Sequence, residues 1–181
     1  MDFKLVLEKL LASFKEQGIR YALIGGFAFG LRGAGRSTVD IDFLVDRSDM
    51  DKVDTTMKGL GYECKYRSEN VSQYVSPLKV FGEVDFLHAF REASLEMLER
   101  AEGKEVFNGA LTVKTLIPED LIGLKLQAIK NDPKREETDM ADIKILFQIY
   151  KNSLDWSLIK KYFKIFGMRD LYEKMSKDIN G

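Results

Sequence analysis

One short segment, residues 39–45, limits the fold most, because it reads VDIDFLV and alternates apolar with polar side chains at its start. Alternation with a period of two is typical of a β-strand with one buried face. On such a strand Asp40 and Asp42 point to one side, while Ile41 and Phe43 point into a core. We therefore expect a sheet that carries two neighbouring carboxylates on one face.

Two adjacent carboxylates need a physical reason, because like charges repel and strand interiors disfavour Asp. Two explanations are open. A divalent cation held by Asp40 and Asp42 would remove the repulsion. Alternatively, the strand face is solvated and near a sheet edge, where water screens the two charges. A third carboxylate, Asp85, lies among apolar neighbours in a strand expected at residues 79–87. Asp85 would complete a site for two metal ions, or it would form an ion pair with a lysine or an arginine.

Composition limits the kind of metal that the chain can bind. The 181 residues include one cysteine, Cys64, and one histidine, His88. An internal disulfide, a cysteine zinc site and a site with several histidines are therefore excluded. Carboxylate ligands favour Mg²⁺, Mn²⁺ or Ca²⁺ over zinc. We expect His88 to be packed or on the surface rather than catalytic.

The charge balance argues against a chain-wide surface for nucleic acid. Lys and Arg number 28 and Asp and Glu number 29, for a formal net charge of −1. Any contact with nucleic acid would need a local patch. The sequence shows neither a signal peptide nor a stretch able to span a bilayer. We expect no membrane partner and a cytoplasmic location.

The pattern of elements divides the chain near residue 116. Residues 1–116 mix short strands with helices, and within them Asn108-Gly109 predicts a two-residue hairpin turn. Residues 117–181 read as helices only, and the first begins at Pro118. We expect an α/β domain over residues 1–116 and a helical subdomain over residues 117–181.

Two glycines, Gly25 and Gly26, lie between a strand expected at residues 21–24 and a short helix expected at residues 27–31. Without side chains they let backbone N–H groups approach a ligand, and the helix N-terminus after them favours anions. This suits a nucleoside triphosphate, and an ordinary turn would also use glycines. Neither a P-loop nor a GxGxxG pattern is present, so those two nucleotide-binding folds are excluded.

A lysine in the helical half stands in an unusual place. Lys125 lies in the middle of the apolar stripe of the helix that begins at Pro118, where lysine is rarely found without a partner. Asp139 and Asp142 lie on the apolar face of the next helix. Lys125 would either form a buried ion pair with Asp139 or reach the phosphates of a nucleotide, with Arg135 and Asp139 around it.

These residues together resemble the nucleotidyltransferase superfamily typified by DNA polymerase beta. The resemblance covers residues 21–45 and 79–87 and is carried by Gly25-Gly26, by Arg36-x-Thr38-x-Asp40-Ile41-Asp42 and by Asp85. The Arg-x-Thr-x-Asp-Ile-Asp form is closest to a small bacterial branch that includes AbiEii-type toxins and minimal nucleotidyltransferases. The family often has serine as the second residue of its glycine motif, where this chain has Gly26.

The resemblance implies an α/β (α+β) fold with a mixed β-sheet flanked by helices and a helical C-terminal part. It implies that Asp40 and Asp42 hold Mg²⁺ on the triphosphate of a nucleotide such as ATP, with Mn²⁺ as the alternative ion. Asp85 would hold the second ion and orient an acceptor hydroxyl. The residues expected around the nucleotide are Gly25, Gly26, Arg36, Thr38, Lys125 and Asp139.

The implied reaction moves a nucleoside monophosphate to an acceptor hydroxyl and releases pyrophosphate. The acceptor would be a tRNA, a protein or a small molecule. The toxin-like branch also implies a toxin-antitoxin role with a cognate antitoxin protein as partner. The alternative is a catalytically inactive nucleotide-binding or interaction protein that retains the fold, and the complete set of Asp40, Asp42 and Asp85 argues against it.

Overall fold

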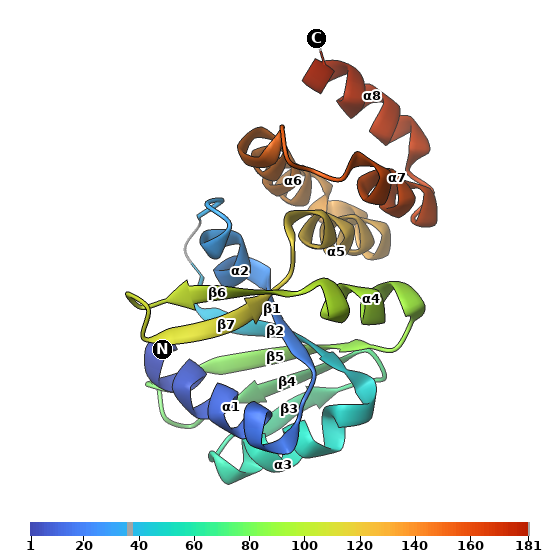
Figure 1. Ribbon diagram of the computed structural model, residues 1–181. Helices are drawn as coiled ribbons and strands as arrows, with labels where there is room; N and C mark the ends of the chain where they lie inside the picture. The colour runs from blue at the N-terminus through green and yellow to red at the C-terminus, as the bar shows by residue number, and fades with distance from the viewer. Residues whose placement is uncertain (36–37, 181) are drawn as a thin grey trace. The chain divides into compact units, whose positions relative to one another are not determined.

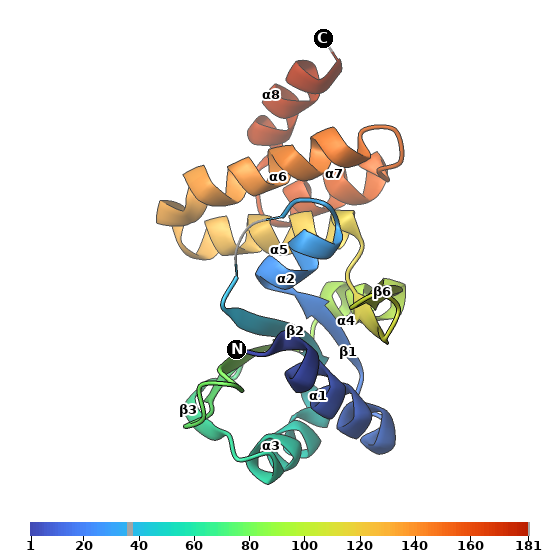
Figure 2. The same ribbon diagram turned by 90° about the vertical axis from the view of Figure 1, so that its left-hand side faces the viewer.

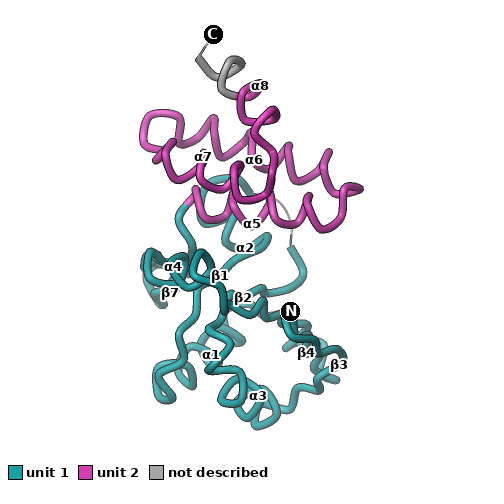
Figure 3. The backbone as a smooth tube through the Cα atoms, turned by 90° about the vertical axis from the view of Figure 1, so that its right-hand side faces the viewer, with its two compact units in different colours: residues 1–117 teal, residues 118–181 magenta. Residues whose placement is uncertain are grey.

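The computed structural model describes residues 1–35 and 38–180 of the chain. The chain forms two compact units, Met1–Ile117 and Pro118–Gly181 (Figure 3). The first unit combines strands and helices, and the second consists of helices. None of the described helices is long and apolar enough to cross a membrane.

The first unit is built on a mixed sheet that has seven strands within the described residues, in the order β3-β4-β5-β2-β1-β7-β6 (Figure 1). Two pairings are parallel, β2 with β5 and β1 with β7, and the others are antiparallel. The strands are β1 (Tyr21–Ile24), β2 (Asp40–Asp46), β3 (Glu63–Arg67), β4 (Val71–Val75), β5 (Glu83–Ala89), β6 (Glu102–Val106) and β7 (Leu111–Thr115).

The helices of the first unit connect these strands. At the start of the helix Phe3–Gln17, the Asp2 side chain accepts a hydrogen bond from the Leu5 backbone N–H. Gly18 ends this helix in a left-handed conformation. The helices are α1 (Phe3–Gln17), α2 (Gly25–Leu31), the 3-10 turn η1 (Arg47–Asp49), α3 (Met50–Gly59) and α4 (Glu92–Arg100).

Helices α1 and α3 cover one face of the sheet (Figures 1 and 2), and the aromatic core of the first unit lies on that face. The ring of Phe14 in α1 lies 5.5 Å from that of Phe43 and 6.3 Å from that of Phe86. The Tyr74 hydroxyl donates a hydrogen bond to Asp54 of α3 at 3.0 Å. Because side chains alternate along a strand, the residues between these aromatics point to the opposite face of the sheet.

The second unit is held together around its first helix. The Tyr162 hydroxyl donates a hydrogen bond to the fully buried Asp120 at 2.6 Å. The ring of Tyr162 also packs on Gly123, where a Cβ atom would meet ring carbons at 3.0 Å. The helices are α5 (Pro118–Asn131), the 3-10 turn η2 (Pro133–Arg135), α6 (Glu136–Tyr150), α7 (Trp156–Ile165) and α8 (Arg169–Asn180).

The expected fold class, a mixed sheet flanked by helices with a helical C-terminal part, is confirmed. Two local predictions are wrong. The strand expected from residue 79 begins at Glu83, because the preceding residues form a turn in which the Phe81 N–H donates to the Leu78 carbonyl. The hairpin loop has four residues rather than two, because Val106 pairs with Leu111 and the residues between them turn outside the ladder.

Candidate active site

Four acidic residues occupy neighbouring positions on one face of the sheet where β2 pairs with β5. In this parallel pairing Asp42 lies opposite Asp85, and Asp40 lies opposite Glu83. Paired residues on adjacent strands point to the same face, and the strands lie about 4.8 Å apart. The three aspartates are half-buried, and Glu83 is exposed. The structure therefore places Asp40, Asp42 and Asp85, the three carboxylates that the sequence singled out, at neighbouring positions of one sheet face.

Asp85 is held through one oxygen, and its other oxygen is buried. Its Oδ2 accepts a hydrogen bond from Gln73 Nε2 at 3.0 Å. Its Oδ1 is buried and has no hydrogen-bond partner among the described residues. Burial raises the pKa of Asp85, the hydrogen bond from Gln73 lowers it, and the negative charges of Glu83 and Asp40 raise it further. A buried carboxylate oxygen without a partner is costly, and a cation would supply the missing interaction.

Asp40 is held by a neutral donor from the segment that precedes β2. The Thr38 hydroxyl donates a hydrogen bond to Asp40 Oδ1 at 2.6 Å. Thr38 in turn lies against the backbone of Gly26, where a Cβ atom would stand 2.8 Å from the Thr38 Cβ and Oγ1. Gly26 therefore makes the room that places Thr38 beside Asp40.

Gly25 likewise makes room for a side chain, that of Asp42. Its φ is +64°, and a Cβ atom there would lie 1.8 Å from Asp42 Oδ2. The sequence interpretation put the glycines in a turn before the helix, but α2 begins at Gly25 itself. Both glycines make room for the side chains of the carboxylate motif, a role that only the tertiary contacts reveal. Binding of phosphate oxygens to their N–H groups stays a prediction, and Arg36 lies outside the described residues.

The donor set of this face fits a hard divalent cation. Carboxylate oxygens are the ligands that Mg²⁺ and Mn²⁺ prefer, and the partnerless Oδ1 of Asp85 needs a positive charge. Across residues 1–35 and 38–180 no three Asp, Glu, His or Cys side chains converge into a ready-made metal site. An ion would therefore draw the carboxylates of Asp40, Asp42 and Asp85 together by rotation of their side chains.

Lys125 is part of a buried charged cluster in the second unit. Its Nζ lies 2.6 Å from Asp139 Oδ1 and 2.6 Å from Asp142 Oδ2. Arg135 Nε lies 2.9 Å from the second oxygen of Asp139. Burial raises the pKa of Asp139, but hydrogen bonds from Arg135 and Lys125 hold it below its ordinary value. The ion pair offered by the sequence is present, with Asp142 as a further partner, and contact of Lys125 with nucleotide phosphates stays a prediction.

His88 is buried, as one of the two expectations for it required. It is 5% exposed, and its Nε2 lies 3.0 Å from the Ser72 hydroxyl. Its Nδ1 lies 3.0 Å from the Glu69 carbonyl oxygen. Burial lowers the pKa of His88, so the neutral ring donates from Nδ1 to the carbonyl and accepts from Ser72. Both ring nitrogens serve packing of the sheet against the turn between β3 and β4.

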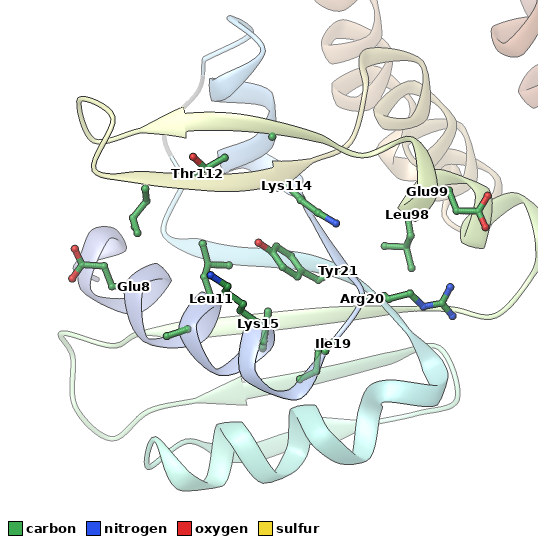
Figure 4. A pocket seen from close by; sticks show the side chains of 15 residues that line it. Glu8, Leu11, Lys15, Ile19, Arg20, Tyr21, Leu98, Glu99, Thr112 and Lys114 are labelled. Atoms are coloured by element: carbon green, nitrogen blue, oxygen red, sulfur yellow. The ribbon is translucent and has the colours of Figure 1, made fainter.

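Figure 4 shows a large hollow of the first unit. This cavity of about 840 Å³ opens between α1, the start of β1 and the β6–β7 hairpin. Its lining includes Leu11, Tyr21, Leu98 and Lys114 and none of the four acidic residues on the sheet face. The candidate active site is therefore the acidic face of β2 and β5 and not this cavity.

Comparison with protein families identifies the chain. A family of uncharacterised nucleotidyltransferases matches residues 3–175, which span the carboxylate motif and most of the second unit. The chain belongs to this nucleotidyltransferase family. A nucleotide substrate follows from that membership. No curated protein sequence matches the chain significantly.

Several solved structures share the fold. The antibiotic-resistance factor ANT(2'')-Ia in complex with adenylyl-2''-tobramycin superposes with a TM-score of 0.64 at 16% identity, covering 91% of this chain and 97% of that one. The lincosamide antibiotic adenylyltransferase LnuA gives 0.56 at 16% identity, with coverages of 81% and 97%. A nucleotidyltransferase-like protein from Paracoccidioides brasiliensis gives 0.59 at 19% identity, with coverages of 99% and 92%. These matches establish the nucleotidyltransferase fold.

Proposed function

We propose that this chain is a metal-dependent nucleotidyltransferase that uses Asp40, Asp42 and Asp85. The observation that carries the proposal is the register that sets Asp42 opposite Asp85, whose buried Oδ1 finds no hydrogen-bond partner in the part of the chain that the structure describes. Family membership supplies the reaction class. Divalent ions held by these carboxylates would stabilise the charge that develops on the attacking and leaving oxygens of the transfer.

In the proposed reaction the acceptor hydroxyl oxygen forms a bond to the α-phosphorus of the nucleoside triphosphate. The bond from the α-phosphorus to the bridging oxygen breaks, and pyrophosphate leaves. Asp40 and Asp42 hold the triphosphate side of the site, and Asp85 orients the acceptor hydroxyl. The hydroxyl proton leaves to water as the new bond forms, because Asp85 Oδ2 is engaged by Gln73 and Oδ1 is the oxygen offered to an ion.

The test uses the unaltered chain and the variant Asp40→Asn/Asp42→Asn. Each purified protein is incubated with Mg²⁺, an NTP labelled at the α-phosphate and a cell extract. The unaltered chain should transfer label to RNA, to protein or to a small molecule, and this product identifies the acceptor class. The variant should fold and transfer no label. Equal labelling by both proteins would refute the assignment of the two carboxylates.

A second candidate function is an inactive binding protein that retains the fold. This candidate also predicts stabilisation by Mg²⁺ and nucleotide, but it predicts no Mg²⁺-dependent labelling in any fraction. The neutral donors Thr38 and Gln73 hold two of the carboxylates without cancelling their charge, which suits a divalent ion under either candidate, so the labelling assay decides between them. The toxin-antitoxin role and the antitoxin partner stay predictions of the resemblance.

A further inference from the structure

Strand β4 contributes an uncharged donor to the acidic face. Gln73 lies directly opposite Asp85 in the antiparallel pairing of β4 and β5, and its Nε2 donates to Asp85 Oδ2 at 3.0 Å. Thr38 stands in a similar relation to Asp40, with its hydroxyl 2.6 Å from Oδ1. Asp40 and Asp85 are thus each held by a neutral side chain.

A neutral donor differs from a cation in its consequence for metal binding. A lysine or arginine at position 73 would also orient Asp85, but it would compensate the negative charge that a divalent ion needs. An amide orients one oxygen and leaves the full charge of the carboxylate in place. In Asp85 the remaining oxygen, Oδ1, is buried and accepts no hydrogen bond from residues 1–35 or 38–180.

We propose that Gln73 is a positioning residue that fixes Asp85 so that Oδ1 binds the second divalent ion of the nucleotidyl transfer. The inference rests on the function proposed above. Gln73 lies on a strand outside the motif segments, and the family match spans it without assigning a role to any residue. Groups that hold a metal ligand from behind typically change metal affinity by about 10–100-fold when they are removed.

The test counts bound Mn²⁺ by electron paramagnetic resonance, with the α,β-methylene analogue of ATP as the nucleotide. The unaltered chain should bind two ions. Gln73→Met keeps the length of the side chain and removes the donor, so it should bind the first ion unchanged and the second about 10–100-fold more weakly. The matched control is Val71→Met, on the same strand and face but paired with Leu87, which should bind both ions like the unaltered chain.

A second variant separates positioning from simple structural support. Gln73→Lys restores a donor to Asp85 and adds a positive charge, so the metal-free protein should melt at or above the temperature of the Gln73→Met variant. Its second Mn²⁺ should nevertheless bind more weakly still. If the hydrogen bond from residue 73 were merely structural, Gln73→Lys would recover both the melting temperature and the affinity for the second Mn²⁺.

Two results would overturn the inference, and they are distinguishable. If Gln73→Met or Gln73→Lys binds the second ion as tightly as the unaltered chain, Gln73 has no positioning role and the proposed function stands. If the unaltered chain binds no Mn²⁺ in the presence of the nucleotide analogue, the proposed function and the role of Gln73 both fail.

Discussion

Replacing Gly25 with alanine should disable the acidic face without unfolding the chain. The new Cβ atom would lie 1.8 Å from Asp42 Oδ2 and 2.6 Å from Asp42 Cγ, so the carboxylate must leave its position. The backbone contributes a separate penalty, because φ is +64° at Gly25 and the left-handed region costs an L-residue about 1–2 kcal/mol. Forcing the Asp42 side chain off its rotamer adds about 0.5–1.5 kcal/mol.

Gly18 provides the matched control within the same unit. Its φ is +63°, and a Cβ atom there would meet nothing within 4 Å. Gly18→Ala should therefore show the backbone penalty alone, about 1–2 kcal/mol in urea unfolding. The difference between the two variants isolates the displacement of Asp42.

The functional measurement is the stabilisation produced by Mg²⁺ and ATP. At a ligand concentration of 100 Kd the unaltered chain should gain about 2.7 kcal/mol, and Gly18→Ala should gain the same. If displacement of Asp42 weakens binding by 10–100-fold, the gain in Gly25→Ala falls to between about 1.4 and 0.4 kcal/mol at that concentration. An equal gain in the two alanine variants would refute the reasoning that Gly25 exists to make room for a metal ligand.

Two further predictions concern buried charge. Lys125→Met should lower the free energy of urea unfolding by about 3–5 kcal/mol, because Asp139 and Asp142 lose a buried cation. Lys125→Met/Asp139→Asn/Asp142→Asn should recover most of that loss, and a stable single variant would contradict the buried cluster. Burial lowers the pKa of His88 below its usual value near 6.5, so its contribution to stability should be complete above about pH 6.5 and fall at lower pH, by at most about 1.4 kcal/mol per pH unit. His88→Gln should weaken this acid dependence of the free energy of unfolding, and identical pH slopes would contradict it.

Local patterns were enough to predict most elements of the first unit. The helix expected at residues 3–17 and the strand expected at residues 21–24 match α1 and β1, because each pattern depends only on residues near one another in the chain. The hairpin after β6 was mispredicted for the opposite reason. Asn108-Gly109 favours a two-residue turn, but the pairing of Val106 with Leu111 leaves a longer loop. That register is set by the ladder and not by the turn residues alone.

The sequence by itself determined that Asp40 and Asp42 share one strand face, since the side chains of a strand alternate with a period of two. It also determined that Lys125 needs a partner, because the apolar face of a helix is buried and a lysine there is not solvated by water. Only the tertiary structure decided that Asp85 lies opposite Asp42, that Gln73 holds it and that Asp142 joins Lys125. These placements depend on which distant segments pair and in which register, and that choice is made by packing of the whole core rather than by the neighbours of any one residue.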